Sequence, residues 1–330
     1  MARNLITDVA GVLVGNAQDN RLASGVTVLL FEEPAVASVD VRGGGPGTRE
    51  TDLLDPQMTV DRIDAIALSG GSAFGLDAPG GVQAYLREQG RGYQVGPARV
   101  PIVPGAILFD LINGGDKDWG RYPPYRELAY EAAANAAEDF ALGSVGAGTG
   151  ATTVNLKGGV GSASAVTADG LSVGALAAVN AAGSVVVGDG PWFWAAPFEQ
   201  NGEFGGCGFP SPLPPDALRP RTKGALRVAT ALVVVATDAL LTKSQTKRFA
   251  VMAQDGLARA SYPVHTPLDG DVVFAAATGT KPLGDPTFAF MRLGAIAANV
   301  VARAVARGVY EAAALPFADA LPSWRDKFER

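Results

Sequence analysis

Few side chains in this sequence could act as a nucleophile or metal ligand in the common arrangements. The chain holds one cysteine, Cys207, and one histidine, His265. Cys207 lies in a Gly-Gly-Cys-Gly run with no neighbour that would lower its pKa, so we expect an inert thiol and a hydrogen-bonded, structural histidine. A single cysteine and a single histidine also exclude the usual structural zinc site within one chain. No metal or other cofactor is expected.

A threonine at the start of a strand offers another route to hydrolysis. An N-terminal threonine can use its own α-amine as the base for its hydroxyl. That chemistry needs a cleavable loop followed by a core strand. Thr230 lies in the apolar run 225–237, which directly follows the Gly/Pro-rich stretch 199–224. On this pattern alone, an ordinary strand residue remains the more frequent interpretation.

Other polar residues have simple structural interpretations when each is taken alone. Asp269 and Asp271 flank a glycine before an apolar run, which is typical of a β-turn. Lys157 would ordinarily be a solvated loop lysine, and Asn180 a turn residue. The run Gly146–Ala151 matches the dinucleotide pattern G-x-G-x-x-G/A, but a predicted helix rather than a strand precedes it, so we expect no nucleotide there.

The elements that must position these residues alternate along the chain. Expected strands cover 26–31, 35–41, 63–69, 161–167, 171–179, 183–188, 225–237 and 271–277, and a Glu-Glu-Pro turn separates the first two. Expected helices cover the segment from Gly-Gly-Ser-Ala-Phe to about Gln89, and residues 125–142, 243–260 and 285–312. Two sheets covered by helices are the natural architecture for this order.

Composition limits the classes of partner. The chain has 330 residues, a net charge of −6 and no cluster of lysine and arginine, which disfavours nucleic acid. No apolar stretch reaches the ~20 residues of a membrane span without an interrupting Gly, Asp or Arg. The N-terminus lacks the long apolar run of a signal peptide, and one cysteine fits a reducing compartment, so we expect a cytoplasmic protein that binds no membrane.

Five spaced segments, in order, resemble the DmpA-like family of self-processing L-aminopeptidase/D-esterases and their nylon-oligomer hydrolase relatives. The segments are GGGPGTRETDLLDP, LSGGSAFGLDAPGGV, VPIVPGAILFDL, GAGTG with LKGG, and the long run from ATALVVVATD to DGDVVFAAATG. The likeness extends from about residue 5 to residue 310.

The resemblance implies an α/β (α+β type) four-layer αββα sandwich, N-terminal-nucleophile-like, with ornithine-acetyltransferase-type topology. It implies one hydrolase domain, 1–330, that cuts itself between Ala229 and Thr230 into chains 1–229 and 230–330, which stay associated. Substrates would be small peptides, aminoacyl amides or amide oligomers. A homo-oligomer of processed heterodimers, a tetramer or larger, is also implied, without cofactor.

The resemblance also assigns roles to single residues. The family nucleophile falls on Thr230, the helper lysine on Lys157 and the oxyanion-hole asparagine on Asn180. The paired acidic or hydroxyl residues fall on Asp269 and Asp271.

Two departures from the family pattern leave an alternative open. Some members place a tyrosine near the position of Phe109, and a polar residue where Ala229 stands. An Ala-Thr cleavage pair is instead typical of ornithine acetyltransferases of the same fold, which makes an acyltransferase the alternative function. The chain lacks the Lys-Gly-rich run and the Pro-Asn of that group, so the hydrolase is favoured. A non-catalytic role would require Thr230 to stay uncut.

Overall fold

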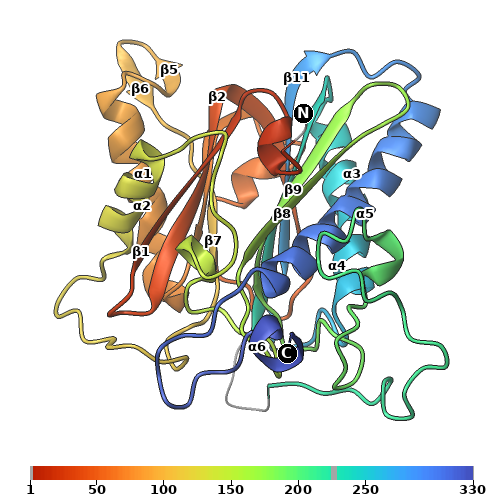
Figure 1. The fold of residues 1–330 in the computed structure, drawn as a ribbon. Coiled ribbons are helices and arrows are strands. Elements are labelled where there is room, and N and C mark those ends of the chain that lie inside the picture. Colours follow the sequence, from red (N-terminus) through yellow and green to blue (C-terminus); the bar gives the residue numbers. More distant parts are fainter. Residues whose placement is uncertain (1–2, 224–228, 330) are drawn as a thin grey trace.

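The computed structural model describes residues 3–223 and 229–329. Figure 1 shows strands in the middle of the molecule, with helices α1 and α2 on one side and α3 to α5 on the other. The strands are β1 (Val12–Asp19), β2 (Ser24–Val41), β3 (Thr48–Arg49), β4 (Arg62–Ser69), β5 (Tyr93–Val95), β6 (Ala98–Val100), β7 (Gly105–Ile107), β8 (Val160–Val166), β9 (Ser172–Asn180), β10 (Thr230–Ala239) and β11 (Val272–Lys281). The α-helices are α1 (Ala78–Glu88), α2 (Tyr125–Ala134), α3 (Lys243–Ala253), α4 (Asp255–Ala260), α5 (Phe288–Tyr310) and α6 (Trp324–Phe328).

The long strand β2 joins the two halves of one continuous nine-stranded sheet, and these halves pack on each other as two sheets. The hydrogen-bonded ladder runs β3-β7-β4-β2-β11-β10-β9-β8, and β1 also pairs with β2. The first part of β2, Ser24–Phe31, pairs with β1, and Val36–Val41 pairs with β11. β4 pairs with Val26–Leu30 and again with Ala35 and Val36. The register with β4 shifts between Leu30 and Ala35, where the strand passes from one sheet to the other.

The expected turn between 26–31 and 35–41 was therefore wrong. Glu32 and Glu33 are exposed and Pro34 is half-buried, yet all three lie inside β2. A charged pair and a proline are tolerated because they lie at the irregularity of the ladder, where no regular pairing is lost.

Three hydrophobic cores separate four layers. Side chains alternate along β10: Leu232 and Val234 face a core shared with Leu29 and Phe274 between the sheets, whereas Val233 faces the helices.

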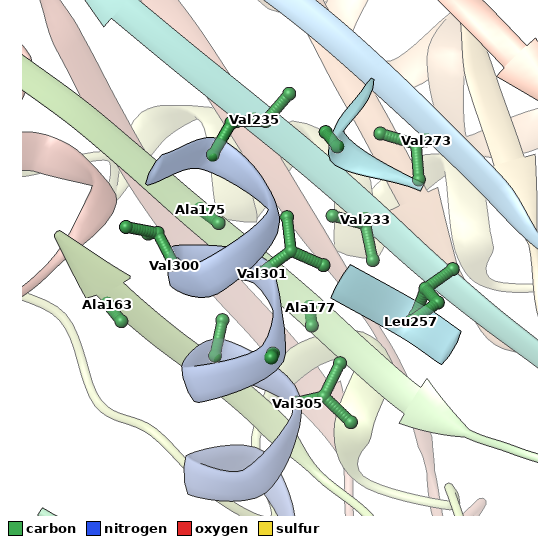
Figure 2. Packing of buried hydrophobic residues seen from close by; sticks show 14 of the residues in the cluster. Ala163, Ala175, Ala177, Val233, Val235, Leu257, Val273, Val300, Val301 and Val305 are labelled. Carbon is green, nitrogen blue, oxygen red and sulfur yellow. The ribbon is translucent and has the colours of Figure 1, made fainter. Parts of the chain in front are cut away.

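Figure 2 shows the outer core, in which Val300, Val301 and Val305 of α5 pack on Val233, Val235 and Val273. On the opposite side, α1 and α2 pack on β1, β2 and β4 through residues such as Val82, Ala129 and Val28. The four-layer αββα sandwich is confirmed.

Other predicted elements differ from the observed ones at their ends. The strands 63–69 and 271–277 and the helix 285–312 are found as β4, β11 and α5. Residues 183–188 form only isolated bridges. The predicted helix 243–260 is divided into α3 and α4, and residues 225–228 of the predicted strand 225–237 lie outside the described residues.

The predicted helix 125–142 stops at Ala134 because the chain changes partner. Ala137 and Val14 exchange two backbone hydrogen bonds, each 3.0 Å long. Pairing with the edge of β1 thus overrides the strong helix propensity of the alanine-rich sequence.

Helix α5 is a core helix. Among the described residues, it alone is long and apolar enough to cross a membrane. However, 61% of its apolar 18-residue segment is buried inside the protein. Its apolar face covers β8 and β9, as in the interior of a globular domain.

Candidate active site

Two neighbouring strands bring Thr230 and Asn180 side by side. Thr230 opens β10 and Asn180 closes β9, and the two residues are direct partners in the antiparallel ladder. Partners in such a ladder project from the same face of the sheet. That face is the one occupied by Leu232 and Val234, so both side chains lie at one end of the core between the sheets. The Thr230 side chain is buried, with 2% exposure.

The hydroxyl of Thr230 lies against the carbonyl group of the preceding residue. Oγ1 donates to the Ala229 oxygen at 2.6 Å, and the backbone N–H of Gly270 donates to the same oxygen at 2.8 Å. A Cβ at Gly270 would stand 2.6 Å from Oγ1, so a side chain there would collide with the hydroxyl. The Ala229 carbonyl is therefore polarised by two donors, and the glycine leaves room for the threonine.

The two acids are fixed around Thr230 by backbone donors. Asp271 Oδ1 accepts the Ala231 N–H at 2.8 Å. Asp269 accepts the Ala182 N–H at 3.3 Å and the Thr266 N–H at 2.7 Å. Burial raises the pKa of Asp269, and the neighbouring charge of Asp271 raises it further. These are not solvated turn residues: both are buried, on the two sides of Gly270.

The glycine-rich segment after β2 lies against this acidic loop. The N–H of Gly43 donates to the Asp271 carbonyl at 3.2 Å, and the N–H of Gly45 donates to the Asp269 carbonyl at 2.7 Å. A Cβ at Gly43 would overlap the Asp271 nitrogen. The backbones approach so closely that only glycine fits at that position.

Asn180 is held by groups from three segments. Its Nδ2 donates to the Phe109 carbonyl at 3.0 Å, and its Oδ1 accepts the Thr152 N–H at 3.0 Å. Lys223 Nζ donates to the same Oδ1 at 2.8 Å. The departure at position 109 therefore lies at the site, and the backbone of Phe109 orients the asparagine.

Sequence reasoning missed Lys223 and Gly270. Lys223 lies in the Gly/Pro-rich stretch before Thr230, where a lysine ordinarily faces solvent, and no motif singles it out. Gly270 contributes a backbone N–H, which a sequence pattern does not reveal. Its place between the two acids was the one available signal.

Lys157 is buried rather than solvated. Its Nζ donates to the carbonyls of Gly148, Ala151 and Gly158 at 2.6–2.9 Å. Burial lowers the pKa of Lys157 to about 7, against the opposing effect of the Asp110 carboxylate. All three hydrogen bonds of the amino group end on backbone carbonyls, so Lys157 is linked to Asn180 through the loop that carries Thr152, not by direct contact.

Two cavities open beside the partners of Asn180. One, of about 800 Å³, is lined by Val154, Asp189 and Thr222, and Thr222 directly precedes Lys223. The other, of about 430 Å³, is lined by Thr152 and by residues of the C-terminal segment, including Asp319. Both are of a size that small ligands occupy in other proteins.

Among the residues that the structure describes, the cysteine has no activating partner. Cys207 is exposed, and its Sγ contacts the Gly205 carbonyl at 3.8 Å. Partial burial raises the pKa of its thiol, as do the carboxylates of Glu199 and Glu329, which disfavours a thiolate. His265 is hydrogen-bonded, as the sequence led us to expect, but its partner is the carboxylate of Asp271.

The glycine-rich run Gly146–Ala151 is a close-packed turn. Gly146–Gly148 form a single 3-10 turn, and a Cβ at Gly148 would overlap the Val160 nitrogen. The backbone N–H of Gly148 is already bonded to the Val145 carbonyl. These glycines serve close backbone packing and the cradle around Lys157.

A family model described as Peptidase family S58 matches residues 4–320. The chain is 44% identical over 346 residues to an uncharacterized aminopeptidase of Mycobacterium tuberculosis, covering 98% of each chain. It is also 34% identical over 104 residues to a 6-aminohexanoate-oligomer endohydrolase of Kocuria sp., covering 32% of this chain and 27% of that protein.

Solved structures share the fold. A Burkholderia sp. beta-aminopeptidase superposes with a TM-score of 0.70 at 24% identity, covering 99% of this chain and 92% of the other. The L-aminopeptidase D-Ala-esterase/amidase from Ochrobactrum anthropi, described as a variant of the Ntn hydrolase fold, gives a TM-score of 0.69 at 21% identity, covering 98% and 91%.

Proposed function

The chain belongs to peptidase family S58 and is a hydrolase acting on amide bonds, and from this premise we propose that Thr230 is its nucleophile, freed by cleavage of the Ala229–Thr230 bond. One observation carries the proposal: the Thr230 hydroxyl lies 2.6 Å from the oxygen of the very carbonyl it must attack. In the uncut chain Thr230 is buried and its nitrogen is an amide, which cannot act as a base.

Self-cleavage needs an acyl shift from nitrogen to oxygen. Thr230 Oγ1 attacks the Ala229 carbonyl carbon and loses its proton, and the C–N bond breaks as the nitrogen gains a proton. The negative charge that develops on the Ala229 oxygen is stabilised by the Gly270 N–H, already 2.8 Å away. Water then hydrolyses the ester, which leaves a carboxylate on Ala229 and a free amine and hydroxyl on Thr230.

The mature site uses the same groups for an external amide. The Thr230 amine, with an ordinary pKa of ~7.7–8.0, takes the hydroxyl proton as Oγ1 attacks the substrate carbonyl. Asp269 and Asp271 orient this amine from the loop that already fixes Ala231. Asn180 donates to the oxyanion from the opposite strand, and Lys157 holds the loop that positions Asn180. Water releases the acyl group, so the reaction is hydrolysis rather than acyl transfer.

The substrate is a peptide or another amide, and we propose a small, linear one that enters through the cavities beside Asn180. The match to the 6-aminohexanoate-oligomer endohydrolase supports linear amide oligomers as one class of substrate. We also propose that the processed chains assemble into a homo-oligomer in the cytoplasm.

The test compares Thr230→Ala with Thr237→Ala. Thr237 is a buried threonine on the same strand, whose hydroxyl donates to the Ser172 carbonyl at 2.8 Å. Thr230→Ala should leave an intact chain with no release of amine from aminoacyl-4-nitroanilides. The control should be cut into fragments 1–229 and 230–330 and remain active.

Mass spectrometry of the small fragment and an assay with acetylornithine plus glutamate complete the test. An active chain that stays uncut, or a Thr230→Ala variant that is still cut, would refute the proposal. Formation of acetylglutamate would instead assign acyl transfer.

A further inference from the structure

The single histidine of the chain lies next to the acidic pair. His265 belongs to the loop between α4 and β11, six residues before Asp271. Its backbone has a φ of +54°, in the left-handed region that few residues other than glycine adopt, although asparagine, aspartate and histidine adopt it more often than the rest. An unfavourable conformation at a half-buried position points to a specific contact that compensates for it.

That contact is with Asp271. The backbone N–H of His265 donates to Asp271 Oδ2 at 3.1 Å, and the ring nitrogen Nδ1 lies 2.9 Å from the same oxygen. Because a carboxylate oxygen only accepts, Nδ1 carries the proton. In the left-handed conformation, the main chain and the ring of one residue therefore meet the same oxygen.

The other oxygen of Asp271 reaches the nucleophile strand. Oδ1 accepts the N–H of Ala231, the residue that follows Thr230. The carboxylate thus links the histidine on one side to the backbone at the nucleophile on the other. Asp271 is 2% exposed at its side chain, so water offers little alternative solvation.

The acidic pair also needs a donor for electrostatic reasons. Asp269 and Asp271 are both buried and lie two positions apart. The Asp271 charge raises the pKa of Asp269, after the larger effect of burial. Two hydrogen bonds from His265 occupy Asp271 Oδ2 and fix the plane of the carboxylate.

We propose that His265 is a positioning residue, which holds the Asp271 carboxylate in the orientation that places Thr230 for self-cleavage and for amide hydrolysis. The inference rests on the proposed role of Thr230. It departs from the interpretation of the sequence, in which His265 was a structural histidine.

Four substitutions at His265 distinguish the effect of losing the hydrogen bond from the effect of straining the backbone. His265→Asn keeps a donor on the γ carbon and tolerates a left-handed backbone, whereas the isosteric His265→Asp replaces the donor by a second acidic group. His265→Gly removes the donor without strain, and His265→Ala removes it with strain. Asn201→Gly is the matched control, because Asn201 is also left-handed, with a φ of +53°, on an exposed loop.

Self-cleavage of newly translated chain and the kcat and KM of the mature enzyme are measured, with the thermal midpoint as a check of folding. His265→Gly should slow cleavage and lower kcat by about tenfold or more with little change in KM, as for loss of a hydrogen bond to a charged group. His265→Asn should recover most of the loss, and His265→Asp should be the slowest. His265→Ala should add a lower thermal midpoint.

Wild-type rates in His265→Gly, or equal loss in the Asn and Asp variants, overturn the inference while the role of Thr230 stands. The isosteric Asn and Asp pair decides the question even if the glycine variant does not fold. A wild-type chain that is never cut before Thr230 overturns the proposed function, and the inference with it.

Discussion

At the scale of the residue, the site is made of backbone groups as much as side chains. Asn180 uses one N–H of its amide to reach the Phe109 carbonyl, and its oxygen is occupied by Thr152 and Lys223. The amide can therefore neither flip nor swing, and its second N–H is the group left to meet an oxyanion. Such preorganised donors lose no energy to reorientation during the reaction.

Asn180→Ala should lower kcat by about a hundredfold or more, as the loss of one oxyanion donor does in other hydrolases. Single-turnover kinetics on the processed enzyme measure this loss. Asn299→Ala, a half-buried amide on α5 that bonds Arg259, is the control and should keep the wild-type rate. A loss below threefold in Asn180→Ala would remove the asparagine from the oxyanion site.

Gly270→Ala should block self-cleavage, because its methyl group would stand 2.6 Å from Thr230 Oγ1 and push the hydroxyl from the Ala229 carbonyl. Electrophoresis of the purified variant would show one full-length chain. Gly80→Ala on α1 is the control, since its new methyl meets only the Arg126 side chain at 3.4 Å. Normal cleavage in Gly270→Ala would show that this crowding is unimportant.

At the scale of the element, strands and helices could be predicted from apolar patterns in the sequence. Pairing between distant segments, which competes with local preferences, could not. β10 and α5 were predictable because their patterns are long and strongly apolar. The end of α2 could not be predicted, because it depends on the pairing of Ala137 with the edge of β1. The continuity of β2 could not be predicted either, because its charged centre lies where the register of the ladder shifts. The resemblance named Thr230, Asn180 and the acidic pair as candidates, whereas finding Lys223 and Gly270 beside them required the fold.

The close contact between the glycine-rich segment and the acidic loop predicts the effect of one added methyl group. Gly43→Ala should displace Asp271 and slow both cleavage and hydrolysis, with a lower thermal midpoint, because its Cβ overlaps the Asp271 nitrogen. Gly80→Ala tests the opposite case, a position on α1 where the new methyl group meets only the Arg126 side chain, at 3.4 Å. Equal effects of the two substitutions would contradict the structural role of Gly43.

At the scale of the whole molecule, the buried Lys157 makes stability depend on pH. Its folded-state pKa of about 7 is below the ordinary value of 10.5. Below pH 7 both states bind the proton and the cost of burying the charge is complete. Between pH 7 and 10.5 the unfolded state binds more protons, so stability rises with pH.

The free energy of unfolding should therefore rise by about 2 kcal/mol between pH 7 and pH 9 through Lys157. Urea denaturation of the uncut Thr230→Ala chain at both values measures the rise. The double variant Thr230→Ala/Lys157→Met should lack this increment. An identical pH dependence in the two chains would show that Lys157 does not titrate in this range.

The place of β10 and β11 in the ladder determines how a cut before Thr230 would change the unfolding of the molecule. β10 is bonded to β9 on one side, and β11 is bonded to β2 on the other, so these two strands lie between strands of the preceding segment. Separating the two pieces means opening both edges, and it divides two of the three hydrophobic cores, which contain residues of both pieces. The cut thus changes the molecularity of unfolding from one chain to two. By mass action, the thermal midpoint of the cut protein should rise with protein concentration, while that of Thr230→Ala stays constant, and calorimetry over a hundredfold dilution series would distinguish the two.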